Sequence, residues 1–251
     1  MGWGLGIALG VVGLGSLGAI LYWAFIITEG AYLGARVVAW TYDLTAKQYD
    51  RIKQFKLEHD VWLIAGPLLG KLKGVRAPLI LDVATGTGRL PHALFSRPFF
   101  DGHLVGLDYS RKMLREAEAK LAVHAGRYTL VWHNAQHLPF PDETFDAVCS
   151  LEALEFMPNP RGVLAEMSRV LRPGGVFLVT NRINWEGKLM PGKAFRKDEF
   201  RALLQGVDLQ RVEFRIWQTY YDLIFARKKG VRSERGRDVQ AIAQILDEIA
   251  L

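Results

Sequence analysis

Two aspartates and two glycines are the residues whose types and spacing first suggest chemistry. In the stretch LILDVATGTGRLP, Asp82 ends an apolar run, and Gly86 and Gly88 lie in the turn that follows. Asp108 ends a second apolar run, in VGLDYS. A carboxylate at the first position favours a ligand with an ammonium group, and one at the second can accept hydrogen bonds from both hydroxyls of a ribose. Together they predict a site for a nucleoside with an amino-acid head and no phosphate, which describes S-adenosylmethionine.

The same turn lacks the residues that phosphate-binding loops require. A Walker loop ends in Gly-Lys-Ser or Gly-Lys-Thr, and this turn contains neither. A dinucleotide fingerprint needs a third glycine where Pro91 stands. Either aspartate alone could instead be the N-cap of a helix, so the prediction rests on two carboxylates that flank one glycine turn.

Two glutamates stand where an acceptor would be met. The segment CSLEALEFMPNP follows the fourth expected strand and contains Glu152 and Glu155. Two carboxylates three residues apart can share one face of a helical turn. They could act as a general base, hold a metal weakly, or stand in solvent at a helix start. Glu155 is the favoured base, because its apolar neighbours Leu154 and Phe156 would raise its pKa.

Histidine and cysteine spacing gives no metal site. His133 and His137 have the i, i+4 spacing of a zinc pair, but that spacing brings two ligands together only on a helix, and these residues flank a loop. The single cysteine, Cys149, excludes a disulfide framework and a cysteine-based zinc site. No metal is therefore expected.

The elements that must position these residues alternate along the chain. Beyond residue 79, short apolar runs typical of strands alternate with amphipathic runs typical of helices, which predicts a parallel sheet covered by helices on both faces. The segment GVDLQRVEFRIWQTYYDLIFARKK contains two strands close in sequence, which favours an antiparallel pair. In such sheets ligands bind at the carboxyl ends of the strands, where both aspartates lie. Glu166 and Arg169 are expected to form a structural ion pair.

Four segments, in this order, carry a resemblance to a known family: LDVATGTG, VGLDYS, NAQHLPFPDETFDAV and EMSRVLRPGG. They resemble the successive motifs of class I S-adenosylmethionine-dependent methyltransferases, in particular the small-molecule branch that includes the ubiquinone and menaquinone methyltransferases. The resemblance covers about residues 42–229. It implies an α/β, Rossmann-like fold with a seven-stranded, mostly parallel sheet, helices on both faces and an antiparallel last strand. It also implies S-adenosylmethionine as the cofactor.

The resemblance assigns cofactor contacts motif by motif. The family's D-x-G-x-G-x-G loop around the methionine part corresponds to Asp82, Ala84, Gly86 and Gly88, with Ala84 replacing a glycine. Asp108 matches the acid that binds the ribose. The residues expected around the adenine are Tyr109, Met113, Asn134, Ala135 and Gln136. Asn134 stands where the family often has aspartate, and its amide oxygen can still accept from the adenine amino group.

The glutamate segment resembles a second family pattern. Ubiquinone-pathway O-methyltransferases carry E-x-x-E-H-x-P-D-P, whose two glutamates and histidine are associated with a divalent metal. Phe156 stands at the histidine position, so one expected ligand is absent. Glu152 is therefore expected to matter less than Glu155 unless a metal bridges the pair.

The N-terminal segment from Trp3 to Thr28 contains no charged residue. As a helix rising ~1.5 Å per residue it would span roughly 39 Å, more than the ~30 Å hydrocarbon core of a bilayer. Trp3 at one end and Tyr22 and Trp23 at the other are placed like interfacial aromatic residues. We predict a retained single-pass transmembrane anchor. The alternatives are a buried core helix and a cleaved signal peptide, although a signal peptide would have a basic start and a shorter apolar run.

Charge and glycine placement add two expectations about this anchor. The net charge is +6, and basic residues follow the span directly: Arg36, Lys47, Arg51, Lys53 and Lys56. By the positive-inside rule the catalytic domain then lies in the cytoplasm. Glycines at four-residue spacing, Gly2, Gly6 and Gly10, would let a second helix approach closely and allow a homodimer.

The expected organisation is an anchor (1–29), a helical lid or linker (30–75), a methyltransferase domain (76–229) and a basic, amphipathic tail (230–251). The leading functional hypothesis is methyl transfer from S-adenosylmethionine to a lipophilic small molecule, such as a quinone, an isoprenoid or a lipid, at the membrane surface. One alternative is a non-catalytic subunit of the same fold that tethers a partner. An RNA methyltransferase is disfavoured, and no nucleic-acid partner is expected, because the basic run RKKGVRSERGR is short and lacks interleaved aromatics. The acceptor, and the choice among C-, O- and N-methylation, stay open.

Overall fold

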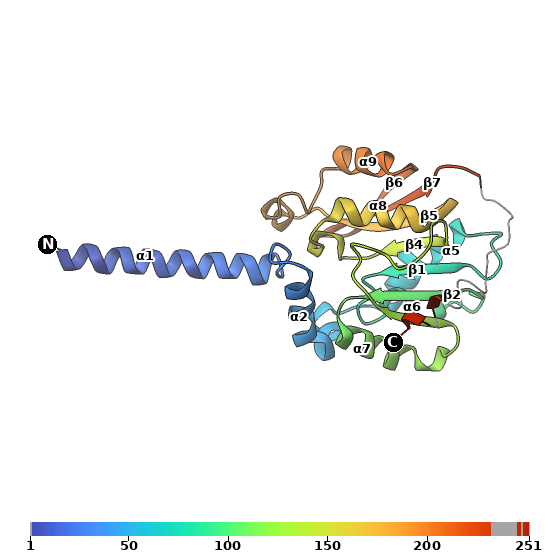
Figure 1. The fold of residues 1–251 in the computed structure, drawn as a ribbon, viewed down its shortest axis with the longest axis horizontal. Helices are drawn as coiled ribbons and strands as arrows, with labels where there is room; N and C mark the ends of the chain where they lie inside the picture. Colours follow the sequence, from blue (N-terminus) through green and yellow to red (C-terminus); the bar gives the residue numbers. More distant parts are fainter. Residues whose placement is uncertain (1, 232–244, 247, 251) are drawn as a thin grey trace.

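The computed structural model describes residues 2–231, 245–246 and 248–250. Figure 1 shows one long helix that projects from a layered α/β body. The strands of its sheet are β1 (Leu79–Val83), β2 (His103–Asp108), β3 (Tyr128–Trp132), β4 (Phe145–Ser150), β5 (Leu171–Arg182), β6 (Leu209–Gln218) and β7 (Tyr221–Lys228). The α-helices are α1 (Gly2–Tyr22), α2 (Ala35–Thr45), α3 (Tyr49–Lys53), α4 (Leu57–Asp60), α5 (Gly66–Lys71), α6 (Arg89–Phe95), α7 (Arg111–Leu121), α8 (Pro160–Val170) and α9 (Lys197–Gly206). Shorter helical turns are Trp23–Ile27, Ala46–Gln48, Val61–Ala65, Ala122–His124, Leu154–Phe156 and Trp185–Leu189.

The seven strands form one sheet in the order β3-β2-β1-β4-β5-β7-β6. β1 pairs in parallel with β2 on one side and β4 on the other, whereas β7 runs antiparallel to both β5 and β6. The predicted fold class, a mostly parallel seven-stranded sheet with an antiparallel last strand, is confirmed. Because the strand order reverses at β1, the crevice where such sheets bind ligands lies at the carboxyl end of that strand.

Alternating side chains of β1 pack on opposite faces of the sheet. Leu81 and Val83 belong to a cluster with residues of α8 and α9, whereas Ile80 belongs to a cluster with residues of α5 and α6. Every residue of β1 is buried. A short apolar run buried on both faces is typical of a central parallel strand, so the predicted helices on both faces are confirmed as well.

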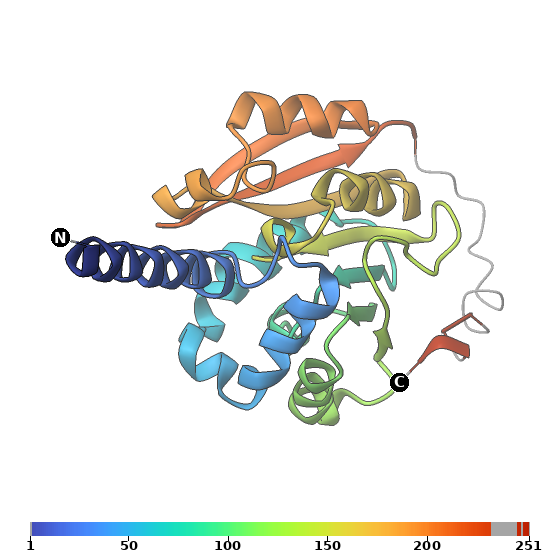
Figure 2. The same cartoon turned by 60° about the vertical axis from the view of Figure 1, so that its left-hand side comes forward.

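Helix α1 leaves the body at the end that carries α2 (Figures 1 and 2). It continues into the π-helical turn Trp23–Ile27, and the stretch Gly6–Ile27 is long and apolar enough to cross a membrane. Only 11% of its most apolar window is buried, so the core-helix alternative is wrong. A signal sequence near an N-terminus meets the same criteria of length and composition, and the retained anchor stays a prediction.

The segment predicted as a lid or linker, residues 30–75, forms α2 to α5. α2 packs against α7, and α4 packs against α6. The C-terminal tail lies partly outside the described residues, namely at 232–244, 247 and 251. Within its described part, Leu246 is buried in the core and Ala250 forms a bridge with Val131 of β3. The limits of the four predicted domains stay a prediction.

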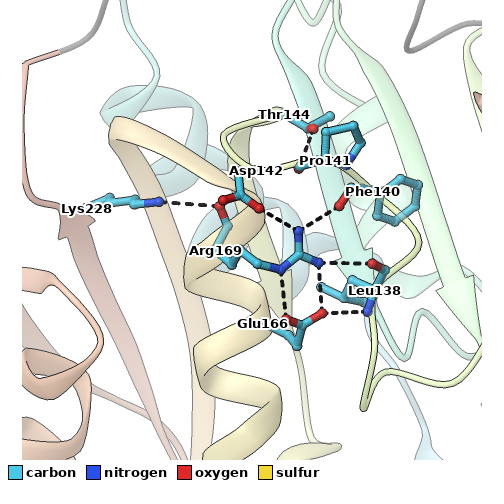
Figure 3. A network of polar contacts seen from close by, with 8 residues as sticks. All are labelled: Leu138, Phe140, Pro141, Asp142, Thr144, Glu166, Arg169 and Lys228. Carbon is cyan, nitrogen blue, oxygen red and sulfur yellow. Dashed lines mark hydrogen bonds and ion pairs between the residues drawn. The ribbon is translucent and has the colours of Figure 1, made fainter.

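Arg169 on α8 holds the loop that joins β3 to β4 (Figure 3). Its Nε and Nη2 donate to the two carboxylate oxygens of Glu166, each at 2.8 Å. Nη1 donates to Asp142 and to the carbonyl of Phe140, and Nη2 also donates to the carbonyl of Leu138. The guanidinium holds the pKa of Glu166 below its usual range. The predicted ion pair is confirmed, and it forms part of a clamp on this loop.

Candidate active site

A cavity of about 760 Å³ opens at the carboxyl ends of β1, β2 and β4. Helix α2 lines it from the outside with four residues, Ala35, Val38, Ala39 and Tyr42. A smaller cavity of about 360 Å³ adjoins it. The two share five lining residues: Tyr49, Ala84, Gly86, Leu151 and Glu152. The cavities are therefore two parts of one site, at the position where the strand order predicts ligand binding.

The loop after β1 adopts a left-handed backbone at three of its predicted cofactor residues. The φ angles are 57° at Ala84, 55° at Gly86 and 78° at Gly88. A Cβ placed on Gly86 would meet nothing within 4 Å, so backbone and open space face the cavity there. Ala84 adopts an angle that favours glycine, which agrees with its standing at a glycine position of the motif. A non-glycine residue in a left-handed backbone conformation is typical of functional loops.

Gly88 has a different role from the other residues of the motif. It lines neither cavity, and a Cβ placed on it would lie 3.3 Å from Ala117 Cβ and Leu121 Cδ1 of α7. A glycine is needed at this position because the loop packs closely against α7 and because φ is positive. In this structure Gly88 is a packing position behind the loop, and its contact with the cofactor stays a prediction.

Asp108 joins the two loops that follow β1 and β2. Its Oδ2 accepts a hydrogen bond from the Gly86 N–H, and its Oδ1 accepts one from the Ser110 N–H, each at 2.8 Å. The carboxylate lines the larger cavity, and burial raises its pKa. Each oxygen keeps a further lone pair, so the group can still accept from ligand hydroxyls.

Asp82 lies beneath the loop and lines the smaller cavity. It is buried and accepts a hydrogen bond from the Thr85 hydroxyl at 2.7 Å. Burial raises its pKa to about 7, against the opposite effect of the Thr85 hydrogen bond. A carboxyl group with so perturbed a pKa in a cleft is a candidate functional group.

The five residues predicted around the adenine all line the larger cavity: Tyr109, Met113, Asn134, Ala135 and Gln136. Asn134 uses its side-chain oxygen to accept from the Gln136 N–H at 3.0 Å, which fixes the turn. Gln136 Nε2 is buried without a hydrogen-bond partner among the described residues. A buried donor of this kind is costly unless a ligand pairs with it.

These features fit the cofactor that the sequence predicts. The space in front of Gly86 admits a ligand next to the backbone, and Asp108 offers acceptors for hydroxyls. Gln136 offers an unpaired donor in the same cavity. Asp82 presents a carboxyl group to the adjoining space. The donor and acceptor set therefore matches a nucleoside with an amino-acid head.

The structure separates the two glutamates. Glu152 lines both cavities and adopts a positive φ of 50°. Its Oε1 accepts from Arg89 Nη1 at 2.6 Å and from Gln218 Nε2 at 3.0 Å. Since both contacts fall on Oε1, Oε2 is the oxygen that can meet an acceptor.

Glu155 instead points away from the site. It lines neither cavity, is 1% exposed, and accepts a hydrogen bond from the Tyr221 hydroxyl at 2.5 Å. Burial raises its pKa, in the predicted direction, and the Tyr221 hydrogen bond opposes that effect. The short helical turn 154–156 directs the Glu155 side chain toward β7, so this geometry does not favour Glu155 as the acceptor-facing base, and its role stays a prediction.

Arg89 is the central site residue that sequence reasoning missed. Its guanidinium donates to both carboxylate oxygens of Asp60 on α4. Its Cζ lies 3.9 Å from the ring centroid of Phe55 and 4.7 Å from that of Trp217. It thereby connects the lid, the loop after β1 and Glu152. The available signal was a lone arginine in the otherwise apolar start of α6. Its partners lie too far along the chain to be paired with it by pattern.

Two tyrosines of the lid were also missed. Tyr42 and Tyr49 both line the larger cavity. Burial, followed by the charge of Glu29, raises the pKa of Tyr42 well above its usual range. Burial, followed by the charge of Glu152, likewise raises the pKa of Tyr49. Both phenols therefore keep their protons at neutral pH. The Tyr42 hydroxyl donates to Glu29, and the Tyr49 hydroxyl can donate into the cavity.

Comparison with known proteins places this site in a family context. Residues 81–179 match a family model described as a methyltransferase domain. The demethylmenaquinone methyltransferase of Bacillus licheniformis is 39% identical over 133 residues, which are 51% of this chain and 55% of that protein. The ubiquinone/menaquinone biosynthesis C-methyltransferase of a Marinomonas strain is 35% identical over 133 residues, 52% of this chain and 53% of that protein. The chain thus spans about half the length of these curated relatives.

Solved structures share the fold at low identity. The [4+2]-cyclase SpnF superposes with a TM-score of 0.65 at 17% identity, over 79% of this chain and 97% of that one. A SAM-dependent methyltransferase from Aquifex aeolicus gives 0.58 at 17% identity, over 74% and 97%. The resemblance to class I S-adenosylmethionine-dependent methyltransferases is confirmed, and the family match supports that cofactor. Since one of these structures is a cyclase, the fold alone does not fix the reaction.

Proposed function

We propose that this chain is an S-adenosylmethionine-dependent methyltransferase that acts on a quinone-type, lipophilic acceptor at a membrane surface. One observation carries the proposal: a single site joins the predicted cofactor residues to Glu152 beneath a lid with an apolar inner face. The relatives named for demethylmenaquinone and ubiquinone or menaquinone methylation support the substrate class over the half of their length that matches.

On the cofactor side, each of the polar residues described above would contact a different part of the cofactor. S-adenosylmethionine, when bound, supplies a methyl group already activated by a sulfonium. Asp108 would accept from the ribose hydroxyls, Asp82 would face the ammonium group, and Gln136 would donate to the adenine edge. The protein's task is then to align an acceptor and to exclude water.

The acceptor side combines apolar walls with two kinds of polar group. Val38, Phe156 and Met157 give the cavity an apolar surface suited to a quinone ring. Tyr49 keeps its proton and can donate a hydrogen bond to an acceptor oxygen. These contacts would orient the ring, while α2 separates it from bulk water.

Glu152 is the base of this proposal. Arg89 and Gln218 hold one oxygen of its carboxylate, so the other can take the proton of an acceptor hydroxyl. Loss of that proton raises the electron density on the hydroxyl oxygen and on the ring carbons conjugated with it. One base therefore serves either O- or C-methylation, and the name of the Marinomonas relative supports C-methylation.

The membrane part of the proposal rests on α1. We propose that Gly6–Ile27 is a retained single-pass anchor and that the basic residues after it place the catalytic domain in the cytoplasm. The glycine face of α1 is open, because a Cβ on Gly6 or Gly10 would meet nothing within 4 Å. A homodimer through this face stays part of the proposal.

Methyl transfer is tested with the full chain in detergent micelles, methyl-labelled S-adenosylmethionine and demethylmenaquinol. A matched acceptor has the same ring and no isoprenoid tail. We expect label in the tailed quinol and much less in the tailless one. Binding of S-adenosylmethionine without transfer to either quinol would refute the substrate class, and equal transfer to both would refute the lipophilic preference.

Anchoring is tested separately by fractionation of cells that express the full chain. We expect it to stay in the membrane pellet after high-salt and carbonate washes, with the catalytic domain open to protease from the cytoplasmic side. Release by salt alone would show that α1 does not span the membrane.

A further inference from the structure

Exposed apolar side chains surround the place where α1 leaves the body. We call six of them, between 41% and 82% exposed, the apolar rim: Trp40, Leu44, Ile183, Trp185, Ile216 and Tyr220. They come from α2, from the loop after β5, and from β6 and the turn that joins it to β7. Single exposed apolar residues need no explanation, but a cluster next to a candidate membrane span does.

Hydrogen bonds join the loop after β5 to the end of the candidate span and to the turn between β6 and β7. Trp23 Nε1, at the end of the span, donates to the carbonyl of Leu189 at 2.9 Å. The Ile183 N–H donates to the carbonyl of Tyr220 at 2.8 Å. Figures 1 and 2 both place the loop after β5 beside the base of α1, with α2 on its other side. The rim therefore forms one surface of the body, the one through which α1 departs.

Helix α2 has apolar residues on two opposite faces. Ala35, Val38, Ala39 and Tyr42 line the cavity. Arg36, Trp40 and Leu44 recur at four-residue spacing, which places them on one stripe of the helix, and all three are exposed. A lid in water needs only its inner face to be apolar. The outer stripe of a cation, a tryptophan and a leucine is typical of a helix that lies in a membrane interface.

Charges near the rim are sorted by sign. Three acids of the lid pair with residues of the body: Asp43 with Ser110, Asp50 with Lys120, and Asp60 with Arg89. The exposed cations nearby are Arg36, Lys47, Arg51, Lys56 and Lys188. Glu58 on α4 is an exposed acid of the same segments, so five exposed cations stand against it and the outer surface is mainly positive, which complements anionic lipid.

We infer that the apolar rim is a second membrane contact, by which the body lies against an anionic bilayer with α2 in the interface. The inference rests on the proposed function for the role of α1, and it deepens that function by giving the acceptor a route. Because α2 has the cavity on one face and the rim on the other, a lipophilic acceptor enters from the bilayer and does not cross water.

The test measures how deep single positions of the full chain lie in lipid. Cysteines are introduced one at a time at Trp40, Trp185 and Ile216, and as controls at Phe99 and Val123, which are exposed near the amino ends of β2 and β3. The native Cys149 is buried, so the unsubstituted chain serves as the labelling blank. Each variant carries an environment-sensitive fluorophore and is reconstituted in vesicles of equal parts phosphatidylcholine and phosphatidylglycerol.

We expect the rim labels to be quenched by nitroxides on lipid chains and shielded from aqueous iodide, and the control labels to show the reverse. Iodide quenching of the rim labels to the level of the controls would overturn the inference. Shielding from iodide without quenching by lipid would assign the rim to a protein partner, and this too would overturn it. The readout needs neither cofactor nor acceptor, so it is independent of methyl transfer.

A charge reversal tests the choice of lipid. The double variant Lys47→Glu, Arg51→Glu should lose shielding at position 40 in the vesicles with phosphatidylglycerol and match the parent in pure phosphatidylcholine. An equal loss in both lipids would refute the electrostatic part of the inference. Carbonate extraction of each variant reports on α1 alone, so a failed anchor and a failed rim give different results.

Discussion

The two walls of the site are held in different ways. The cofactor wall consists of the loops after β1 and β2, residues 84–88 and 109–113, and backbone hydrogen bonds to Asp108 join these loops. The lid wall consists of α2 to α4, and the side chains of Asp43, Asp50 and Asp60 hold it to the body, whereas α5 packs in the core against β1. The N–H groups that bind Asp108 belong to the backbone of the two loops, so the shape of the cofactor wall is fixed by local sequence. The side-chain pairs of the lid wall can separate while the sheet stays folded.

This difference indicates that the cofactor wall determines cofactor binding and that the lid wall controls entry of the acceptor. The cofactor wall offers polar groups at fixed positions, as a ligand with many hydrogen-bonding groups requires. The lid wall offers apolar side chains and two phenols on a segment that three acidic residues hold to the body. We therefore expect substitutions in the cofactor wall to change cofactor affinity, and those in the lid wall to change handling of the acceptor.

The largest effect is expected where the two walls meet. Glu152→Gln removes the proposed base while keeping an oxygen for Arg89, so turnover should fall at least ~100-fold, the low end for general acid–base catalysis. The affinity for S-adenosylmethionine should stay within a few-fold, as measured by calorimetry.

The matched variant for this prediction is Glu155→Gln. It lies outside the cavity, so it should lose less activity than Glu152→Gln. Chelators should leave both enzymes unchanged, since Phe156 stands at the position of the histidine that is associated with a metal in the resembling pattern. Full turnover in Glu152→Gln would show that Glu152 is not the base and that the protein accelerates the reaction only by aligning the acceptor with the methyl group.

The cofactor wall is tested by Asp108→Ala. Loss of the hydroxyl acceptor, and of the bonds that join the two loops, should weaken binding of S-adenosylmethionine by about 1–3 kcal/mol. Asp198→Ala, an exposed position on α9, is the control and should bind as the parent does. Unchanged affinity in Asp108→Ala would remove this residue from the site.

The cofactor wall could be predicted from sequence because its determinants are local. Each strand, its turn and the residue at its tip lie within about a dozen positions, and the left-handed angles at Ala84 and Gly86 follow from the motif itself. The alternation of apolar and amphipathic runs likewise predicted the parallel sheet, and the short connection between the last two strands predicted their antiparallel pairing. The packing of Gly88 against α7 could not be predicted, because a sequence pattern does not distinguish a glycine that faces a ligand from one that faces a helix.

A helical lid was predicted from the sequence, but its contacts with the body could not be, because their determinants are distant in sequence. Arg89 meets Asp60, Glu152 and Trp217, and no periodicity connects these positions. The choice between Glu152 and Glu155 depends on the short helical turn after β4, whose direction the sequence does not reveal. Spacing placed both carboxylates near the acceptor, and only the backbone decides which of them faces it.

The lid wall is tested by Asp60→Asn. The loss of one charge from a buried, doubly hydrogen-bonded pair should lower the free energy of unfolding by about 1–2 kcal/mol. It should also raise the KM of the acceptor more than that of S-adenosylmethionine. Glu58→Gln, two residues earlier and exposed, is the control. An equal rise in both KM values would show that the lid does not act on the acceptor alone.

The smallest effect is expected at Asp82, and its sign should be opposite to that of Asp60. Burial raises the pKa of Asp82 to about 7 in the folded chain, against about 4 in the unfolded chain. The folded state therefore binds more protons between these values, and stability falls as pH rises from about 4 to about 7. Asp82→Asn removes this cost, so at a pH of about 8 the Tm should rise, and the difference should vanish near pH 4. Scanning fluorimetry of the full chain across this range measures it, and weaker binding of S-adenosylmethionine by the same variant would show that the charge serves the ligand. If Asp82→Asn instead destabilises the chain at high pH as Asp60→Asn does, both walls are held by their acids and the contrast between them fails.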